Sequence, residues 1–338
     1  MRVLVTGGAG YIGSTATVML IEKGVQVTVL DDLSTGHRES VHPDARFVEG
    51  SITEKGACHQ ALSGVDAVMH FAAKSLVGES VEQPEKYWST NVMGTRTLLN
   101  QMREFGVKKL INSSTAAIYG ESEQTPIPED AMTKPTNTYG STKLAVEMMI
   151  TNDAAAFGLQ AMSLRYFNVA GAIKSESILL GDGTGWLAER HSPETHLIPN
   201  ILKSTTSNPI KLFGRDWPTV DGTCIRDYIH VGDLINAHLL ALEFVNTSEK
   251  STTGFHQIVN VGSGAGYSVQ QVIYAAHEVL NIQIPTQDTH RRAGDPATLV
   301  ADITRAKELL NWEPEHDIKE MISDAHHALQ SVGNTKKK

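Results

Sequence analysis

The feature that most constrains this chain is a glycine-rich turn that directly follows an apolar strand. Residues 2–6 read Arg-Val-Leu-Val-Thr, and Gly7, Gly10 and Gly13 come next in the spacing Gly-x-x-Gly-x-x-Gly. A Cβ atom at such a turn would block the bend and hold a pyrophosphate away from the backbone, whereas the following helix directs free N–H groups at that phosphate. Asp31 closes the second strand 18 residues after Gly13. A carboxylate there accepts hydrogen bonds from a ribose 2′-hydroxyl and repels a 2′-phosphate, so the segment predicts an NAD site.

The composition limits the class of protein. The chain has 338 residues, enough for two domains, and a formal charge of −9, which argues against nucleic acid or an anionic membrane as a partner. No apolar run approaches a membrane span, and the start reads as a core strand rather than a signal peptide. Cys58 and Cys224 are not paired as Cys-x-x-Cys, as is usual in a reducing compartment. We therefore expect a cytoplasmic protein, with residues 331–338 as a flexible tail.

Short apolar segments alternate with helical patterns through the first half of the chain. Strands are expected at 46–48, 66–70, 108–112 and 160–165, and helices at about 84–105 and 138–156. This alternation predicts an α/β fold with a Rossmann-type, doubly wound parallel sheet over residues 1–170. Ligands bind such sheets beyond the carboxyl ends of the strands, so one cleft is expected there.

The alternation breaks after residue 170. Residues 171–194 are rich in Gly, Ser and Glu without clear periodicity, and we expect a surface loop. Helices are expected at about 195–206, 231–245, 268–280, 304–310 and 318–329, with short strands at 210–213 and 258–260. The pattern predicts a smaller mixed α/β substrate domain over residues 171–330, from which some segments return to the first domain.

Tyr139 and Lys143 form the decisive catalytic pair. Residues four apart share a helix face, so the phenol and the ammonium can address the same point. Bringing a tyrosine pKa from ~10 to ~7 takes roughly 4 kcal/mol, and a lysine cation with an oxidised nicotinamide favours the phenolate. Thr115 is the candidate third member, whose hydroxyl would bond the reacting oxygen. Alternatively, Thr115 and the two serines before it only end a strand.

With these motifs the chain resembles the extended short-chain dehydrogenases/reductases, and within that superfamily it is most similar to the UDP-glucose 4-epimerase (UDP-galactose 4-epimerase) family. The similarity runs over nearly the whole length. The glycine turn and the Tyr/Lys pair mark only the superfamily. Closer to the epimerases are Gly-Glu-Ser at 78–80, Asp-Gly-Thr-Cys-Ile-Arg-Asp-Tyr at 221–228 and Arg-Arg-Ala-Gly-Asp at 291–295.

The resemblance implies NAD-dependent interconversion of UDP-galactose and UDP-glucose by reversible oxidation at sugar C4, through a 4-keto intermediate. Tyr139 would take the proton of the 4-hydroxyl, Thr115 would position that oxygen, and Lys143 would hold the nicotinamide ribose. The implied NAD contacts are Gly7, Gly10, Tyr11, Ile12, Gly13, Asp31, Asp32, Ser51, Ile52, Phe71, Ala72, Ser75, Asn91, Ser113, Tyr139, Lys143 and Tyr166. The implied UDP-sugar contacts are Thr115, Tyr139, Asn168, His196, Leu197, Phe213, Arg226, Tyr228, Arg292 and Asp295.

The sequence departs from the family pattern at four of these or neighbouring positions. Ser51 stands where an aspartate usually contacts adenine, and Ser75 where some members place a lysine near the cofactor. His196 replaces an asparagine. Leu299 occupies a position where some relatives carry a tyrosine that crowds the sugar C2 substituent, so UDP-N-acetylglucosamine is an alternative or additional substrate.

Other functions stay open at this point. A nucleotide-sugar 4,6-dehydratase would need an Asp-Glu pair where this chain has Ala116 and Ala117, so it is disfavoured. A UDP-glucuronate decarboxylase or epimerase is harder to exclude, because its carboxylate-binding group could come from any loop. A non-catalytic, NAD-sensing regulator could discard the Tyr139/Lys143 pair, which this chain retains.

The expected partners follow from the same patterns. No metal is expected, because the 14 histidines are scattered and no His-Glu-x-x-His motif occurs. The resemblance implies a homodimer in which helices 84–105 and 138–156 pair with a second copy, although the same apolar faces could simply cover the sheet.

Overall fold

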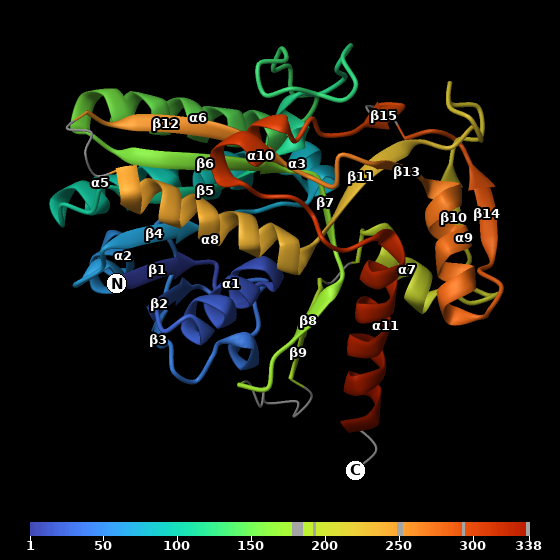
Figure 1. The fold of residues 1–338 in the computed structure, drawn as a ribbon, viewed down its shortest axis with the longest axis horizontal. Helices are drawn as coiled ribbons and strands as arrows, with labels where there is room; N and C mark the ends of the chain where they lie inside the picture. Colours follow the sequence, from blue (N-terminus) through green and yellow to red (C-terminus); the bar gives the residue numbers. More distant parts are fainter. Residues whose placement is uncertain (178–184, 192–193, 249–252, 293–294, 336–338) are drawn as a thin grey trace.

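The largest sheet of the molecule has seven strands, is wholly parallel and lies in the left half of Figure 1. The computed structural model describes residues 1–177, 185–191, 194–248, 253–292 and 295–335. The strand order is β12-β6-β5-β4-β1-β2-β3, formed by β1 (Arg2–Thr6), β2 (Gln26–Asp31), β3 (Arg46–Glu49), β4 (Ala67–His70), β5 (Lys109–Thr115), β6 (Gln160–Tyr166) and β12 (Phe255–Val261). The predicted Rossmann-type sheet is thereby confirmed.

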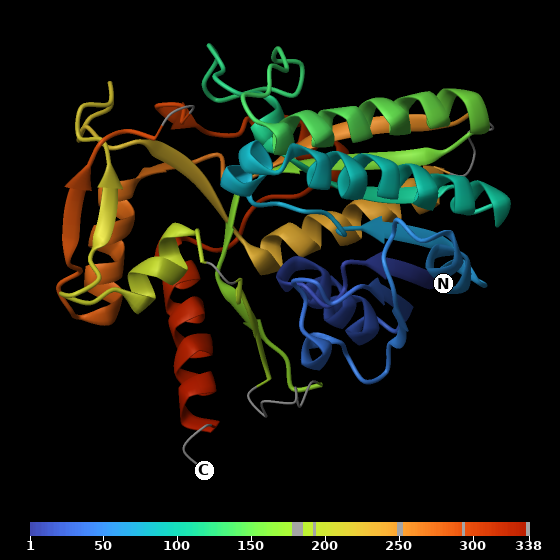
Figure 2. The same ribbon diagram turned by 180° about the vertical axis from the view of Figure 1, so that it is seen from behind.

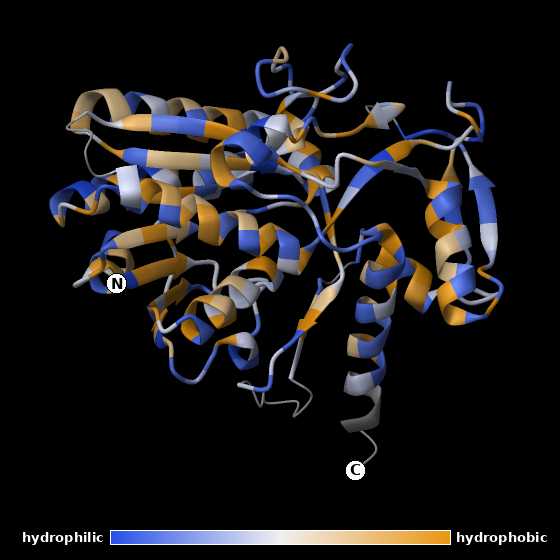
Figure 3. Ribbon diagram, viewed as in Figure 1, coloured by the Kyte–Doolittle hydropathy of each residue, from blue (hydrophilic) through white to orange (hydrophobic). Residues whose placement is uncertain are grey.

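Helices cover both faces of this sheet because successive residues of each strand point to opposite sides (Figures 1 and 2). Val3 and Val5 pack with α1 (Tyr11–Glu22) and α8 (Val231–Thr247). Leu4 packs on the other face with α2 (Lys55–Leu62), α5 (Thr95–Glu104) and α6 (Thr138–Phe157). Figure 3 shows β1 in hydrophobic colours along most of its length, as expected for a strand buried on both faces.

The helix expected at about 84–105 is interrupted. It consists of α4 (Pro84–Tyr87), a π-helical segment η2 (Trp88–Gly94) and then α5. Gly94 permits a close approach at this point, since a Cβ on it would lie 2.8 Å from the Cδ1 of Ile52. Upstream, α3 (Val77–Glu82) occupies the loop after β4.

The C-terminal half builds smaller sheets beside the large one. β11 (Ile225–His230) pairs with β7 (Asn168–Ala170), β13 (Gly266–Ser268) and β15 (Thr298–Leu299), and β10 (Ile210–Phe213) pairs with β14 (Thr286–Thr289). The helices are α7 (Leu197–Lys203), α9 (Val269–Leu280), α10 (Thr304–Leu310) and α11 (Ile318–Thr335). Apolar side chains of α7, α9 and α11 form a separate core with β10 and β11.

Three expectations for this half need correction. Residues 171–194 are not only a loop, because β8 (Ala172–Lys174) and β9 (Trp186–Ala188) pair antiparallel, while 178–184 and 192–193 lie outside the described residues. The strand expected at 258–260 is part of the longer β12, which joins the large sheet beside β6. The tail expected from 331 is wrong up to Thr335, where α11 ends, and 336–338 are not described.

None of the helices in the described ranges is long and apolar enough to span a bilayer.

Candidate active site

A cleft of about 1390 Å³ opens at the carboxyl ends of the central strands. It is lined by the expected cofactor residues Gly7, Gly10, Tyr11, Ile12, Gly13, Asp31, Asp32, Ser51, Ile52, Phe71, Ala72, Ser75, Ser113, Tyr139, Lys143 and Tyr166. The expected substrate residues Thr115, Asn168, His196, Leu197, Phe213, Arg226, Tyr228, Arg292 and Asp295 line it as well. The fold therefore brings together side chains from both halves of the chain, at the point where β1 has β2 on one side and β4 on the other.

The glycine turn between β1 and α1 has the shape of a phosphate cradle. Gly7 has a φ of +72°, and a Cβ on it would lie 2.7 Å from the backbone nitrogen of Ala72. A Cβ on Gly13 would lie 2.2 Å from the carbonyl oxygen of Gly7. The N-cap of α1, Gly10, makes no side-chain capping bond, and the first turn carries no acid. The first N–H groups of α1 can therefore receive an anionic diphosphate, and the turn fits a dinucleotide.

Asp31 is held in place at the end of β2. Its side chain accepts hydrogen bonds from the backbone nitrogens of Ala9 (2.9 Å) and Leu33 (2.8 Å). Burial raises the pKa of this carboxyl, and those two hydrogen bonds lower it in part. The neighbouring Asp32 accepts from the backbone nitrogen of Ser34 at 3.0 Å. Asp31 is thus held at the lining of the cleft, next to the glycine turn.

Tyr139, Thr115 and Lys143 meet where β5 ends and α6 begins. Asn137 caps α6 by accepting from the backbone nitrogen of Gly140 at 2.9 Å, which fixes the first turn and Tyr139 with it. Lys143 Nζ donates to the carbonyl oxygen of Ser113 at 2.9 Å. The spacing of four residues thus places both side chains toward the end of the same strand, as the sequence predicts.

The electrostatics of this group differ from the simplest expectation. Burial raises the pKa of Tyr139 to about 12, and its hydrogen bond with Thr115 lowers that pKa only in part. Burial lowers the pKa of Lys143 to about 8, while the carboxylate of Glu147 acts in the opposite sense. The fold alone therefore favours the protonated phenol of Tyr139 at neutral pH, whereas positive charge placed next to the phenol would favour the phenolate.

Asn91 takes a different place from the one expected. It does not line the cleft, although it lies in the π-helical segment η2 close behind. Its Oδ1 accepts from the backbone nitrogen of Lys74 (2.8 Å), and its Nδ2 donates to the Lys74 carbonyl oxygen (3.0 Å) and to Thr142 Oγ1 (3.0 Å). Asn91 therefore ties the loop after β4 to α6, and this geometry favours positioning over direct contact with a cofactor.

A buried ion pair next to Lys143 on α6 was not predicted. Glu147 and Arg165 have side chains 3% and 4% exposed, and both guanidinium nitrogens Nε and Nη2 donate to the carboxylate, at 3.0 and 2.6 Å. Ser114 donates to the same carboxylate at 2.6 Å. Because Glu147 lies one turn after Lys143 on α6, its register could have suggested this role, but its partner on β6 could not be read from spacing.

Both arginines that were expected to contact a substrate, Arg226 and Arg292, line the cleft. Arg226 is anchored by donating from Nη1 to the carbonyl oxygens of Ile225 (2.9 Å) and Pro296 (2.8 Å), and its Nη2 lies 3.8 Å from Asp295. The Arg292 guanidinium lies 3.7 Å from the centre of the Phe213 ring. Residues 293–294, between Arg292 and Asp295, lie outside the described residues.

The positions that depart from the family pattern also face the cleft. Ser51, Ile52, Ser75 and Leu299 line it, and Ser51 Oγ accepts from the backbone nitrogen of Thr53 at 3.3 Å. Lys74 Nζ donates to Ser34 Oγ at 2.7 Å, across the loops that follow β4 and β2.

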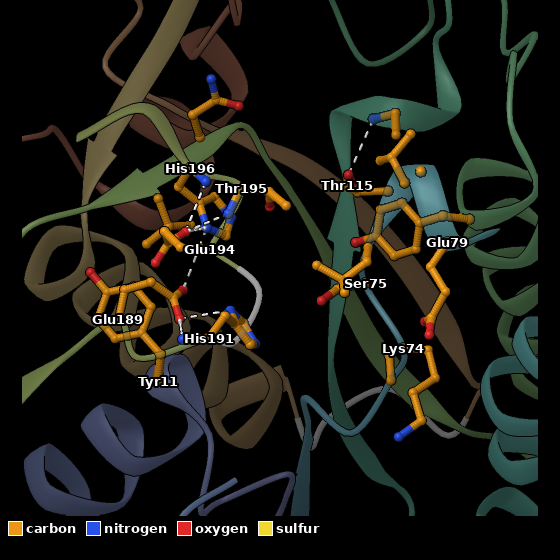
Figure 4. A pocket seen from close by; sticks show the side chains of 18 of the residues that line it. Tyr11, Lys74, Ser75, Glu79, Thr115, Glu189, His191, Glu194, Thr195 and His196 are labelled. Atoms are coloured by element: carbon orange, nitrogen blue, oxygen red, sulfur yellow. Dashed lines mark hydrogen bonds and ion pairs between the residues drawn. The ribbon is translucent and has the colours of Figure 1, made fainter. Parts of the chain in front are cut away.

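A second group of titratable side chains was missed by the sequence reasoning. Glu189, His191, Glu194 and His196 gather on one wall of the cleft beside Tyr11, opposite Ser75 and Thr115 (Figure 4). The pKa of His191 is raised, chiefly by its contact with Glu189. Burial lowers the pKa of His196, but the carboxylates of Glu194 and Glu189 outweigh it and the net shift is upward. Glu189, His191 and Glu194 lie in the segment 171–194 that the sequence predicts to be a surface loop, so only His196 has a predicted role.

The chain matches known proteins along almost its entire length. The model of the NAD dependent epimerase/dehydratase family matches residues 3–262. A UDP-glucose 4-epimerase of Corynebacterium glutamicum is 50% identical over 99% of this chain and 97% of its own. The crystal structure of UDP-glucose 4-epimerase from Brucella ovis in complex with NAD has a TM-score of 0.87 and 39% identity, covering 96% of this chain and 97% of that one.

A third relative has a broader description. The UDP-Glc/GlcNAc 4-epimerase of Campylobacter jejuni has a TM-score of 0.81 and 33% identity, covering 97% of this chain and 99% of that one. Together with the glycine cradle, Asp31 and the Tyr139/Lys143 pair, these matches show that the chain belongs to the NAD dependent epimerase/dehydratase family.

Proposed function

We propose that this chain interconverts UDP-galactose and UDP-glucose by reversible oxidation at sugar C4, with NAD held in the cleft. The observation that carries this proposal is the convergence of Tyr139, Thr115 and Lys143 on the same cleft as the glycine cradle. The relatives at up to 50% identity are UDP-glucose 4-epimerases, which supports it. In this proposal residues 1–170 hold most of the cofactor, and residues 171–330 supply most of the sugar-nucleotide contacts.

The chain's own residues move the proton. Bound NAD⁺ would supply a hydride acceptor that later returns the hydride. Tyr139 takes the proton of the 4-hydroxyl as the C4–H bond breaks, which leaves a 4-keto sugar, and gives it back when the hydride adds to the opposite face. Thr115 positions the 4-oxygen, and the ammonium of Lys143 favours the phenolate.

The far end of the cleft would hold the nucleotide. Arg226 and Arg292 carry fixed positive charge in a protein whose net charge is −9, and a guanidinium matches the oxygens of a diphosphate. Phe213, already packed against the Arg292 guanidinium, offers a flat apolar surface to a uracil ring. The cleft, at about 1390 Å³, exceeds the roughly 300–1,000 Å³ that is usual for the pocket of one small ligand, which suits a dinucleotide and a sugar nucleotide bound together.

The test is Tyr139→Phe, assayed with UDP-galactose and no added cofactor by following UDP-glucose. We expect a fall of at least about 10²-fold in turnover, since a positioned acid–base group contributes that much or more, with NAD content unchanged. Tyr119→Phe is the control, because it also removes the hydroxyl of a buried tyrosine. The Tyr119 hydroxyl is hydrogen-bonded to Asn260 Oδ1 (2.7 Å) and Arg165 Nη1 (2.9 Å), so its loss should not affect the proton transfer. Equal, measurable turnover in wild type and Tyr139→Phe would overturn the role given to Tyr139. Absence of turnover in the wild type, with NAD bound, would overturn the epimerase proposal and favour an NAD-sensing regulator.

A second substrate, UDP-N-acetylglucosamine, is favoured by Leu299. This residue lines the cleft from β15, and a leucine leaves more room for an N-acetyl group than the tyrosine of some relatives. The Campylobacter jejuni relative is described as acting on both UDP-Glc and GlcNAc forms. A turnover assay with UDP-N-acetylglucosamine tests this, and absence of any product would dismiss it.

Two other nucleotide-sugar reactions remain for comparison. Ala116 and Ala117, directly after Thr115, supply no acid for the elimination that a 4,6-dehydratase performs. A tenfold preference for UDP-glucuronate over UDP-galactose in the same assay would revive a decarboxylase or an epimerase of that sugar.

We further propose a homodimer in the cytoplasm. Trp88, Met93, Met148 and Phe157 expose between 42% and 61% of their surface on the α5–α6 side of the sheet, an apolar face that suits a second copy. Light scattering after gel filtration should give twice the mass of 36.7 kDa, and a monomer would refute the dimer.

A further inference from the structure

The cluster formed by Glu189, His191, Glu194 and His196, which we call the cleft-wall cluster, is not needed for the proton transfer above. One ligand atom each from Glu189, His191 and His196 can be chosen so that all three lie within 4.8 Å of one another. Glu194 Oε1 lies 2.9 Å from His196 Nδ1. Two imidazoles and two carboxylates therefore converge on a small volume, and Figure 4 shows them turned toward each other.

Backbone N–H groups hold each of the two carboxylates in place through one of its oxygens. Glu189 Oε1 accepts from the backbone nitrogens of Arg190 (2.9 Å) and His191 (3.0 Å). Glu194 Oε1 accepts from the backbone nitrogens of Thr195 and His196, both at 2.8 Å. These bonds orient the carboxylates much as outer hydrogen bonds orient the ligands of a metal ion.

Two atoms of the cluster are buried without a hydrogen-bond partner in the described part of the chain. The first is Glu194 Oε2, on a side chain that is only 7% exposed. The second is His191 Nδ1, which lies 2.6 Å from Glu189 Oε1 but without the alignment of a hydrogen bond. Unpaired buried polar atoms are costly, and a carboxylate oxygen and an imidazole nitrogen can both give a lone pair to a cation.

The donor set indicates which cation suits the cluster. Two imidazole nitrogens with carboxylate oxygens bind Zn²⁺ and similar ions at about 2.0–2.2 Å, so ligand atoms around one ion lie roughly 3–3.5 Å apart. The ligand atoms of Glu189, His191 and His196 lie within 4.8 Å of one another, so they need to approach by roughly 1–2 Å to reach that spacing. A dication also balances charge, because two carboxylates here lie beside Tyr11 at the start of α1, where an anionic diphosphate is expected.

We propose that the cleft-wall cluster binds one divalent transition-metal ion of the zinc type. Glu189, His191 and His196 supply three ligands, and Glu194 supplies the fourth through Oε2. The ion joins the end of β9 to the start of α7 and takes no part in hydride or proton transfer. Binding displaces any proton carried by the two imidazoles, so affinity falls as pH is lowered.

The test uses the full chain, stripped with a chelator and then titrated with Co²⁺ while the visible absorption of the ion is followed. We expect saturation at one Co²⁺ per chain, displacement by Zn²⁺, and at least about tenfold weaker binding in His191→Gln. His326→Gln is the matched control. His326 and His327 are adjacent histidines on α11 that could hold an ion adventitiously, so this variant should bind as wild type does.

The outcomes separate clearly. No stoichiometric binding at pH 7.5, or equal binding by wild type and His191→Gln, overturns the proposal and leaves two His–Glu ion pairs instead. Circular dichroism and NAD content of His191→Gln are compared with the wild type first, which separates loss of the metal site from misfolding. Glu194→Gln provides a second variant with the same expected loss. The experiment measures metal binding, so its result tests the metal-site proposal independently of epimerase activity.

Discussion

Replacing Glu147 by glutamine should destabilise the fold and also shift the pH dependence of catalysis. Glu147 and Arg165 have side chains that are 3% and 4% exposed, and the carboxylate receives hydrogen bonds from two guanidinium nitrogens and from Ser114. Removing one partner of such a pair leaves a buried charge uncompensated, which costs about 3 to 5 kcal/mol. Arg165 keeps its bonds to Tyr119 Oη and the Glu129 carbonyl oxygen, and the glutamine offers one uncharged acceptor oxygen where the carboxylate offered two.

That free energy converts into a measurable melting shift. Unfolding entropies of about 2.1 cal/mol/K per residue give about 0.7 kcal/mol/K for a chain of this length, so the midpoint should fall by roughly 4 to 7 °C. Calorimetry at a fixed scan rate measures it. Glu104→Gln is the matched control, because the Lys55–Glu104 pair (3.1 Å) has side chains 69% and 48% exposed, and exposed pairs contribute little.

The same variant reports on Lys143. The carboxylate of Glu147 supports the ammonium of Lys143, whose pKa is already lowered by burial to about 8. Without that carboxylate the pKa falls further, so the loss of kcat/KM on the alkaline side should begin at lower pH in Glu147→Gln. A midpoint within about 1 °C of wild type, together with an unmoved pH profile, would refute the reasoning.

Three further predictions follow from the cleft. In the wild type, kcat/KM should fall as pH rises through about 8, where Lys143 loses its proton. Lys143→Arg should move that fall to higher pH, because a guanidinium stays charged. Coincident pH profiles of the two proteins would contradict this. Gly13→Ala should weaken NAD binding by at least about tenfold, since its Cβ would lie 2.2 Å from the carbonyl oxygen of Gly7; retention of NAD at wild-type content after purification would contradict this. Leu299→Tyr should lower kcat/KM for UDP-N-acetylglucosamine relative to UDP-glucose by about tenfold, and an unchanged ratio would show that this position does not set the choice.

Local spacing explains why much of the site could be predicted. The interval from Gly7 to Gly13 and the position of Asp31 fix a strand, turn, helix and second strand, and each step depends on neighbours in the chain. Tyr139 and Lys143 are four residues apart on a helix, so their common direction also follows from local geometry. The alternation of strands and helices likewise predicted the parallel sheet that the structure confirms.

Other features depend on which segments meet after folding. The partner of Glu147, the place of Asn91 behind the cleft and the return of β12 (Phe255–Val261) to the large sheet all join parts of the chain that no spacing connects. The helix predicted at about 84–105 contains a π-helical segment that ends at Gly94, where the backbone lies close to Ile52, a residue more than 40 positions earlier in the chain.

The sequence by itself therefore determined the sheet, the dinucleotide cradle and the pairing of a tyrosine with a lysine, since hydrophobic period and residue spacing act over a few turns. Only the tertiary structure decided the pKa values of the side chains in the cleft and the distances between their charges. Burial raises the pKa of Tyr139 to about 12. Folding also places Glu189, His191 and His196 close together on one wall of the cleft. Desolvation and the distances between charges exist only once distant segments have packed together, and for that reason they could not be read along the chain.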